Sequence, residues 1–281
     1  MNVPGDETVY SIAQLPEPQL RRIAGGSAAV FTTPNPAKDG DNEDAAALIP
    51  AGDERAVLAV ADGLGGHAAG AEAARIAVDE LARSIADQAA PGEPLRPAIL
   101  NGIETANIRI GLLGLGAATT LAIVELDGRS LRPYHVGDSE ILVVGQRGKV
   151  KLQTISHAPV AYAVEAGLMT GAEAMHHEDR NLVSNIVGSP DMRIEIGSVL
   201  RLAPRDTVLL ATDGLSDNLY GQEIIDTIRR GPLGDAARRL VDDAQQRMRR
   251  PEAGKPSKPD DLTFVLYRPG APAEPPRPAS V

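Results

Sequence analysis

The sequence predicts an α+β fold in which two stacked antiparallel sheets are flanked by pairs of helices, a four-layer αββα sandwich. Two patterns favour this fold. Short apolar segments follow one another with tight turns between them, which is typical of antiparallel strands. Pairs of longer segments carry apolar residues three or four positions apart, which predicts amphipathic helices that cover the faces of sheets.

These patterns place the elements along the chain. The expected strands cover residues 27–33, 45–49, 55–61, 119–126, 131–136, 141–144, 150–155, 199–202, 207–211 and 262–267. The expected helices cover residues 70–88, 95–113, 161–166, 171–175, 222–229 and 235–249. Because only a short turn separates the strands at 45–49 and 55–61, we expect these two strands to form an antiparallel hairpin.

The elements predict a single domain over residues 27–267. Residues 1–26 are polar, and we interpret them as an N-terminal extension with one helical turn at residues 19–23. Residues 268–281 are rich in proline, which predicts a disordered tail.

Composition limits the possible functions. The chain has 281 residues, a net charge of -10 and no cysteine. The lack of cysteine excludes disulfides, thiolate chemistry and cysteine-bound zinc, and leaves carboxylates and histidines as metal ligands. An acidic chain without a long basic run is a poor ligand for nucleic acid or anionic membranes, and no apolar stretch is long enough to span a bilayer. We expect a cytoplasmic monomer that binds neither nucleic acid nor membrane.

Carboxylates recur at the ends of the predicted strands, next to a glycine or another acid. They are Glu43-Asp44, Asp62-Gly63, Asp138, Asp213-Gly214 with Asp217, and Asp260-Asp261. Any one of these groups also fits a turn or a helix cap. Their recurrence within one domain favours a site for hard cations such as Mg²⁺ or Mn²⁺, which prefer oxygen ligands from several elements.

Three common sequence motifs for binding phosphate or a metal ion do not match this chain. The glycine-rich turn after Asp62 lacks the Gly-Lys-Ser/Thr of a Walker loop, and Ala68 stands where a dinucleotide-binding loop needs its third glycine. The acidic run at residues 39–44 does not match an EF-hand, because Asp44 occupies the position of the required glycine.

Five motifs follow one another in order along the chain. They are Asn42-Glu43-Asp44, Asp62-Gly-Leu-Gly-Gly-His67-Ala-Ala-Gly70, Gly137-Asp138-Ser139, Thr212-Asp213-Gly-Leu-Ser-Asp217 and Asp260-Asp261-Leu-Thr263. In this order they resemble the metal-dependent serine/threonine protein phosphatases of the protein phosphatase 2C family, in its bacterial form. The resemblance extends over residues 27–267, which would form the catalytic domain.

The resemblance implies two core metal ions, Mn²⁺ or Mg²⁺, and a third ion that binds more weakly. Asp62 would bridge the two core ions and is a candidate catalytic residue. Glu43 and the Gly63 carbonyl would serve the first ion. Asp213 and Asp260 would serve the second.

The third ion would be held by Asp138, Asp213 and Asp217, according to the same resemblance. Asp44 is the other candidate catalytic residue and would orient the attacking water from behind the metal ligands. Two cations neutralise a phosphoester dianion and lower the pKa of a bridging water. The resemblance therefore implies hydrolysis of phosphoserine and phosphothreonine in proteins without a phosphoenzyme intermediate.

The chain departs from the family pattern where the substrate phosphate is held. Many members carry a phosphate-gripping arginine at the place of Asp39, and Lys38 is the candidate substrate-binding residue in its stead. A solvated loop position is the alternative for Lys38. Leu64 stands where some members have a histidine proposed as general acid. Glu140 replaces a usual arginine, and Asp261 replaces a common asparagine.

Three functions fit these residues. The first is metal-dependent hydrolysis of phosphoserine and phosphothreonine in a phosphoprotein, opposing a serine/threonine kinase, and this is the function we expect. The second is a catalytically weak pseudophosphatase that binds a phosphoprotein as a regulator, which Asp39 favours and the complete set of metal carboxylates disfavours. The third is hydrolysis of a small phosphate ester by the same chemistry.

Overall fold

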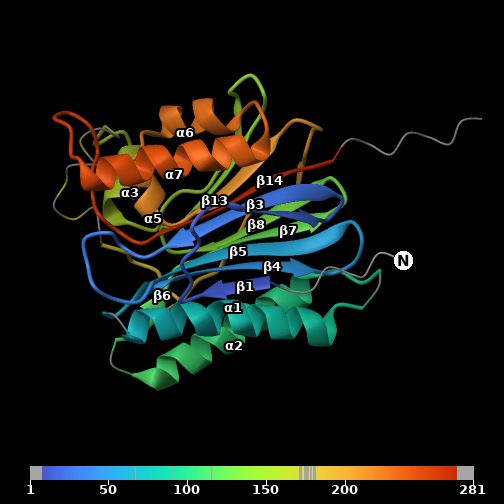
Figure 1. Ribbon diagram of the computed structural model, residues 1–281. Coiled ribbons are helices and arrows are strands. Elements are labelled where there is room, and N and C mark those ends of the chain that lie inside the picture. Colours follow the sequence, from blue (N-terminus) through green and yellow to red (C-terminus); the bar gives the residue numbers. More distant parts are fainter. Residues whose placement is uncertain are drawn as a thin grey trace, which may run out of the picture.

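The computed structural model describes residues 8–66, 68–90, 92–114, 116–170, 173, 177, 179 and 182–270. In this part of the chain, two antiparallel sheets are stacked face to face, with a pair of helices against the outer face of each (Figure 1). The predicted four-layer αββα fold is confirmed.

The first sheet has eight strands within the described residues. They are β1 (Thr8–Ser11), β4 (Asp44–Pro50), β5 (Arg55–Leu64), β6 (Ala118–Thr119), β7 (Leu121–Asp127), β8 (Ser130–Val136), β11 (Glu195–Ile196) and β12 (Leu200–Arg201). The main path runs in the order β1-β4-β5-β7-β8-β11, while β6 pairs with β5 and β12 with β8. The predicted hairpin is β4 and β5, which pair from Asp44 opposite Asp62 to Pro50 opposite Ala56.

The second sheet has six strands in the same described ranges. They are β2 (Gln19–Ile23), β3 (Gly26–Thr33), β9 (Glu140–Val144), β10 (Val150–Gln153), β13 (Thr207–Ala211) and β14 (Leu262–Arg268). Their order is β10-β9-β13-β14-β3-β2. β3 and β14 pair from Ser27 opposite Arg268 to Thr33 opposite Leu262, so strands from the two ends of the chain lie side by side.

Helices cover the outer faces of both sheets. The helices of the described residues are α1 (Ala68–Gln88), α2 (Arg96–Leu113), α3 (Pro159–Glu165), α5 (Asp213–Ser216), α6 (Gly221–Ile228) and α7 (Leu233–Arg249). α1 and α2 pack on the first sheet, and α6 and α7 on the second (Figure 1). The expectation missed the short α5, and the helix expected at residues 171–175 lies largely outside the described residues.

The position of strand β5 in the sandwich explains why its sequence is an unbroken apolar run. Successive side chains of a strand point to opposite faces. Val57 and Ala59 therefore pack under α1 and α2, while Leu58 and Val60 pack between the two sheets. All four side chains are fully buried, because β5 is covered on both faces.

Some expectations about local structure are wrong. Residues 19–23 form strand β2 instead of a helical turn, and β1 also lies in the segment expected as an N-terminal extension. That segment thus adds an edge strand to each sheet, and the division of the chain at residue 27 stays a prediction. The strands expected at residues 119–155 are split between the sheets, because the chain crosses from β8 to β9 at residues 137–139.

The strand ends that carry the predicted site residues meet at one end of the sandwich. In an antiparallel hairpin the start of one strand lies beside the end of the other, so Asp44 lies opposite Asp62. Asp138 lies in the crossing after β8, Asp213 directly after β13, and Asp260 shortly before β14. This end lies at the left of Figure 1, near α5 and β6.

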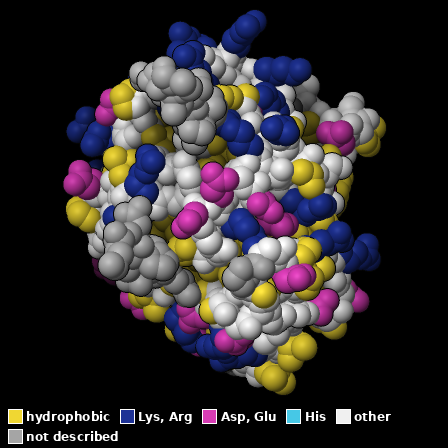
Figure 2. Space-filling model, turned by 90° about the vertical axis from the view of Figure 1, so that its right-hand side faces the viewer, with side chains coloured by type: hydrophobic (Ala, Val, Ile, Leu, Met, Phe, Trp, Pro, Cys, Tyr) yellow, Lys and Arg dark blue, Asp and Glu magenta, His cyan; other side chains and the backbone are white. Residues whose placement is uncertain are grey.

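The opposite end of the sandwich faces the viewer in Figure 2. Basic side chains gather toward the top of this face, on the side of the α6–α7 layer, and acidic and basic side chains are interspersed over the rest of it. The face therefore carries both signs of charge. No helix in the described part of the chain is long and apolar enough to cross a membrane.

Candidate metal centre

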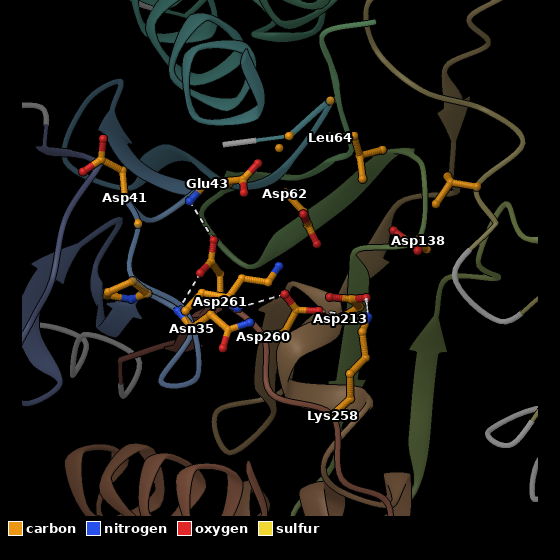
Figure 3. Close-up of a pocket in the computed structure, with 17 residues that line it drawn as sticks. Asn35, Asp41, Glu43, Asp62, Leu64, Asp138, Asp213, Lys258, Asp260 and Asp261 are labelled. Carbon is orange, nitrogen blue, oxygen red and sulfur yellow. Dashed lines mark hydrogen bonds and ion pairs between the residues drawn. The ribbon is translucent and has the colours of Figure 1, made fainter. Parts of the chain in front are cut away.

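A cavity of about 270 Å³ opens where these strand ends meet. The predicted site residues that line it are Lys38, Glu43, Asp62, Gly63, Asp138, Asp213 and Asp260. Figure 3 shows Asp62 near the middle of this group, between Glu43 on one side and Asp138 and Asp213 on the other. Asp217 lines an adjoining cavity that shares Asp138 and Asp213 with the first. The predicted metal ligands therefore lie in or beside one cavity.

The backbone of Asp62 is held on both sides by threonines. Its N–H donates to Thr120 Oγ1 at 3.1 Å. Its carbonyl accepts from the Thr120 N–H at 2.9 Å and from the Thr119 hydroxyl at 2.8 Å. The Thr120 hydroxyl also lies 2.6 Å from the hydroxyl of Ser139, the residue after Asp138. One threonine thus links the end of β5 to the crossing between the sheets.

Repulsion among the carboxylates indicates a site built for positive charge. Burial raises the pKa of Asp62 well above its ordinary value, and the neighbouring Asp44 and Asp213 raise it further. Burial, followed by Asp213, raises the pKa of Asp138 to about 7. The pKa of Asp260 is raised by the same two causes. Bound cations would remove this repulsion, since hard divalent ions take several carboxylate oxygens at once.

Asp44 lies behind the cavity and does not line it. Its side chain is buried, and one carboxylate oxygen accepts a hydrogen bond from the Thr212 hydroxyl at 2.8 Å. Its N–H donates to Asn42 Oδ1 at 3.0 Å. Burial, followed by Asp261, raises the pKa of Asp44 well above its ordinary value. Asp44 is therefore a buried carboxylate directly opposite Asp62 in the hairpin.

The absence of a side chain at Gly70 makes room for two oxygen ligands beside Asp62. A Cβ at Gly70, in the first turn of α1, would meet Glu43 Oε2 and would lie 2.9 Å from the Gly63 carbonyl oxygen. Because Gly70 has no side chain, the Glu43 carboxylate and the Gly63 carbonyl can stand together at this point. A carboxylate next to a carbonyl suits Mg²⁺ or Mn²⁺, so the residues present fit a divalent cation. His67, which lies between Gly63 and Gly70 in the sequence, is outside the described residues.

Lys258 is a site residue that sequence reasoning missed. Its Nζ lies 2.8 Å from Asp213 Oδ2, 2.9 Å from Asp217 Oδ2 and 2.9 Å from Asp260 Oδ2 (Figure 3). Burial by itself would lower the pKa of Lys258, but these carboxylates raise it above its usual value, so the ammonium stays charged. In the sequence Lys258 is one lysine in a polar loop, and nothing local connects it to Asp213, which is 45 residues away.

The rim of the cavity carries Lys38 but not its neighbour. Lys38 is exposed and lines the cavity, whereas Asp39 is exposed and does not line it. Asp261 holds both ends of the loop that carries Lys38 and Asp39: its carboxylate accepts the N–H of Asn35 at 2.6 Å and the N–H of Glu43 at 2.7 Å. Asp261 therefore positions a predicted ligand without being one of the predicted ligands.

A second group with metal-ligand chemistry lies where β8 meets β11. A ring nitrogen of His135, one of His157 and an oxygen of Glu195 lie within 4.8 Å of one another. The hydrogen bonds disfavour a metal there. His157 Nδ1 accepts from the Gly137 N–H at 3.0 Å and from the Asn185 side-chain amide at 2.9 Å. Its proton is therefore on Nε2, which donates to Glu195 at 3.0 Å and offers no lone pair.

Known proteins resemble this chain over most of its length. The family model described as Protein phosphatase 2C matches residues 36–255. Protein phosphatase PhpP of Streptococcus pneumoniae is 32% identical over 196 residues, which cover 66% of this chain and 78% of that protein. Serine/threonine protein phosphatase PstP of Mycobacterium tuberculosis is 28% identical over 218 residues, which cover 75% of this chain and 40% of that protein.

Solved structures of serine/threonine phosphatases also resemble this chain over most of its length. The serine/threonine phosphatase of S. agalactiae has a TM-score of 0.73 and 28% identity, over 86% of this chain and 98% of that chain. The catalytic domain of PstP in complex with 2 manganese ions has a TM-score of 0.69 and 25% identity, over 87% of this chain and 98% of that chain.

The fold and the carboxylate centre define the class of metal-dependent serine/threonine protein phosphatases, which is the enzyme class that the motifs predicted. This chain belongs to the protein phosphatase 2C family. The family match ends before Asp260, so that residue joins the site through its place in the cavity.

Proposed function

We propose that this chain hydrolyses phosphoserine and phosphothreonine in a phosphoprotein, with Mn²⁺ or Mg²⁺ as cofactor. The observation that carries the proposal is one cavity lined by carboxylates from both sheets, with the pKa of Asp62 raised by burial and by its acidic neighbours. A phosphate monoester is a dianion, and it can approach these carboxylates only when bound cations outweigh their charge. The names of the relatives support a phosphoprotein as the substrate.

We assign the ligands to three metal positions that share residues. The first position consists of Glu43, Asp62 and the Gly63 carbonyl, the second of Asp62, Asp213 and Asp260, and the third of Asp138, Asp213 and Asp217. Asp62 would belong to the first two positions, and the place of its carboxylate between Glu43 and Asp213 supports that shared role (Figure 3). The third position is the weaker one in this proposal.

The bound cations would neutralise the phosphate and activate water for in-line attack at phosphorus, without a phosphoenzyme intermediate. The chain's own residues orient the reactants. Asp44 is held by Thr212 behind Asp62, where it would orient the attacking water. Lys38 lies at the rim, where its ammonium would attract the substrate phosphate as a point charge.

Phosphate release from a phosphothreonine peptide tests this proposal. We expect turnover with Mn²⁺, loss of turnover in excess chelator, and loss in Asp62→Asn because the bridging carboxylate is gone. The matched control is Asp53→Asn, which changes an exposed aspartate in the turn before β5 and should leave turnover unchanged. Robust turnover in chelator would contradict the proposal. Faster turnover of a small phosphate ester than of the peptide would contradict the substrate class.

A catalytically weak phosphoprotein-binding protein is the second candidate, and the rim of the cavity favours it. Asp39 supplies no positive charge there, and Lys38 lacks the two-pronged geometry of an arginine. Binding of a phosphothreonine peptide without turnover in saturating Mn²⁺ would support this candidate over the first.

The opposing serine/threonine kinase, the monomeric state and the cytoplasmic location stay predictions. Light scattering coupled to size-exclusion chromatography measures the oligomeric state directly. A mass above that of one 29.4 kDa chain would contradict the monomer.

A further inference from the structure

Lys258 brings a positive charge to the junction of the second and third metal positions. Its ammonium contacts Asp213, Asp217 and Asp260 at 2.8–2.9 Å. Asp213 belongs to both of these positions, Asp260 to the second and Asp217 to the third. The ammonium therefore uses carboxylate oxygens that a divalent cation in either position would need.

The backbone of Lys258 is fixed beside the centre by a buried asparagine. The Lys258 N–H donates to Asn218 Oδ1 at 2.9 Å, and the Lys258 carbonyl accepts from Asn218 Nδ2 at 2.8 Å. Asn218 is fully buried and also donates to the Gly214 carbonyl at 2.9 Å. The backbone is thus anchored to the segment that carries Asp213, and only the flexible side chain is left to move.

The side chain can leave the carboxylates without unfolding this anchor. It is 22% exposed, so water reaches part of it. A lysine has a four-carbon stem with free rotation and a strongly hydrated head group. A divalent cation carries twice the charge of the ammonium and takes several oxygens at once. A cation bound to these carboxylates would lie close to the ammonium, and repulsion between the two positive charges favours release of one when the other binds.

We propose that Lys258 is a built-in competitor for the second and third metal positions, so that divalent cations bind this chain stepwise and most tightly at the first position. The proposal rests on the metal centre of the proposed function. Without cations, Lys258 neutralises part of the acidic cluster. With cations, its ammonium moves to solvent, and the cost of that release weakens binding at the second and third positions.

Isothermal titration of the metal-free full chain with Mn²⁺ tests the proposal. In the wild type we expect one tight binding step followed by weaker ones. Lys258→Met should tighten the second step by about 10- to 100-fold, the range expected for removing a close, partly buried charge. Lys258→Arg keeps the charge and should keep the weak second step.

Lys255→Met is the matched control, because Lys255 lies in the same loop and forms an exposed ion pair with Glu252. It should titrate like the wild type. A second step in Lys258→Met that is unchanged or weaker than in the wild type would overturn the proposal, and so would equal affinities for the first two ions in the wild type. If Lys258→Met does not fold without metal, the titrations of the wild type and of Lys258→Arg still test the proposal, because equal affinities for the first two ions would contradict it. The titration reads binding alone, so it is independent of whether the peptide is hydrolysed.

Discussion

Replacing Asp138 by asparagine should stabilise the metal-free protein at neutral and alkaline pH. Burial, with Asp213 as the next cause, raises the pKa of Asp138 from 3.8 to about 7 in the folded protein. Between these pH values the folded protein keeps a proton that the unfolded chain has released. The free energy of unfolding therefore falls as pH rises through this window, and the penalty is complete above about pH 7. At pH values below 3.8 both states hold the proton and the penalty is absent.

The size of the effect follows from the shift. About 3 pKa units at about 1.36 kcal/mol each correspond to a penalty of up to about 4 kcal/mol above pH 7. That is a large share of a total stability of about 5–15 kcal/mol. Asparagine has the same shape and no charge, so Asp138→Asn should recover up to about 4 kcal/mol at about pH 8 and little at about pH 4. Saturating Mn²⁺ should remove the pH dependence of the wild type, because the cations neutralise the same carboxylates.

Urea denaturation in excess chelator at several pH values measures this effect. Asp53→Asn serves as control, because this exposed turn residue should change stability by no more than about 0.5 kcal/mol at any pH. A gain for Asp138→Asn that is the same at every pH, or largest at acid pH, would refute the electrostatic reasoning.

Three further outcomes are expected. Gly70→Ala should weaken binding of the first Mn²⁺ by at least about tenfold in a calorimetric titration, because the new Cβ meets Glu43 Oε2 and crowds the Gly63 carbonyl; unchanged affinity would show that this corner holds no cation. Asp39→Arg should lower the KM for a phosphothreonine peptide with little change in kcat, because the longer arginine side chain, next to Lys38, could extend to the rim and supply the missing fork for phosphate; an unchanged KM in steady-state kinetics would place residue 39 away from the bound phosphate. Leu58→Ala should lower the free energy of unfolding by about 2–5 kcal/mol, because Leu58 is fully buried between the sheets; a loss below about 1 kcal/mol in urea denaturation would contradict close packing there.

Local patterns were sufficient for most of the fold. The unbroken apolar run of β5 predicted a strand because its side chains are buried on both faces, and the short turn before it predicted the hairpin with β4. The predicted starts of α1 and α7 lie two residues inside the observed helices, since apolar spacing describes the middle of a helix better than its ends.

Apolar spacing and turn motifs did not predict strand β2 or the crossing between the two sheets. The segment at residues 19–23 lies at a sheet edge with three of its five side chains exposed, so its strand conformation comes from pairing with β3 and not from an apolar alternation. The crossing at residues 137–139 looks like a hairpin turn in the sequence. It joins two sheets instead, because β8 pairs with β7 and β9 with β13.

The sequence by itself predicted the candidate oxygen ligands of the centre and determined the family. A carboxylate beside a glycine at a strand end is a local signal, and the order of the five motifs is visible along the chain. Only the tertiary structure decided how charge is balanced among these groups. Asp44 lies behind the cavity, Asp261 holds backbone amides, and Lys258 reaches three carboxylates from another loop. Electrostatic interactions depend on distance in space and on burial, and neither can be read from the spacing of residues along a chain.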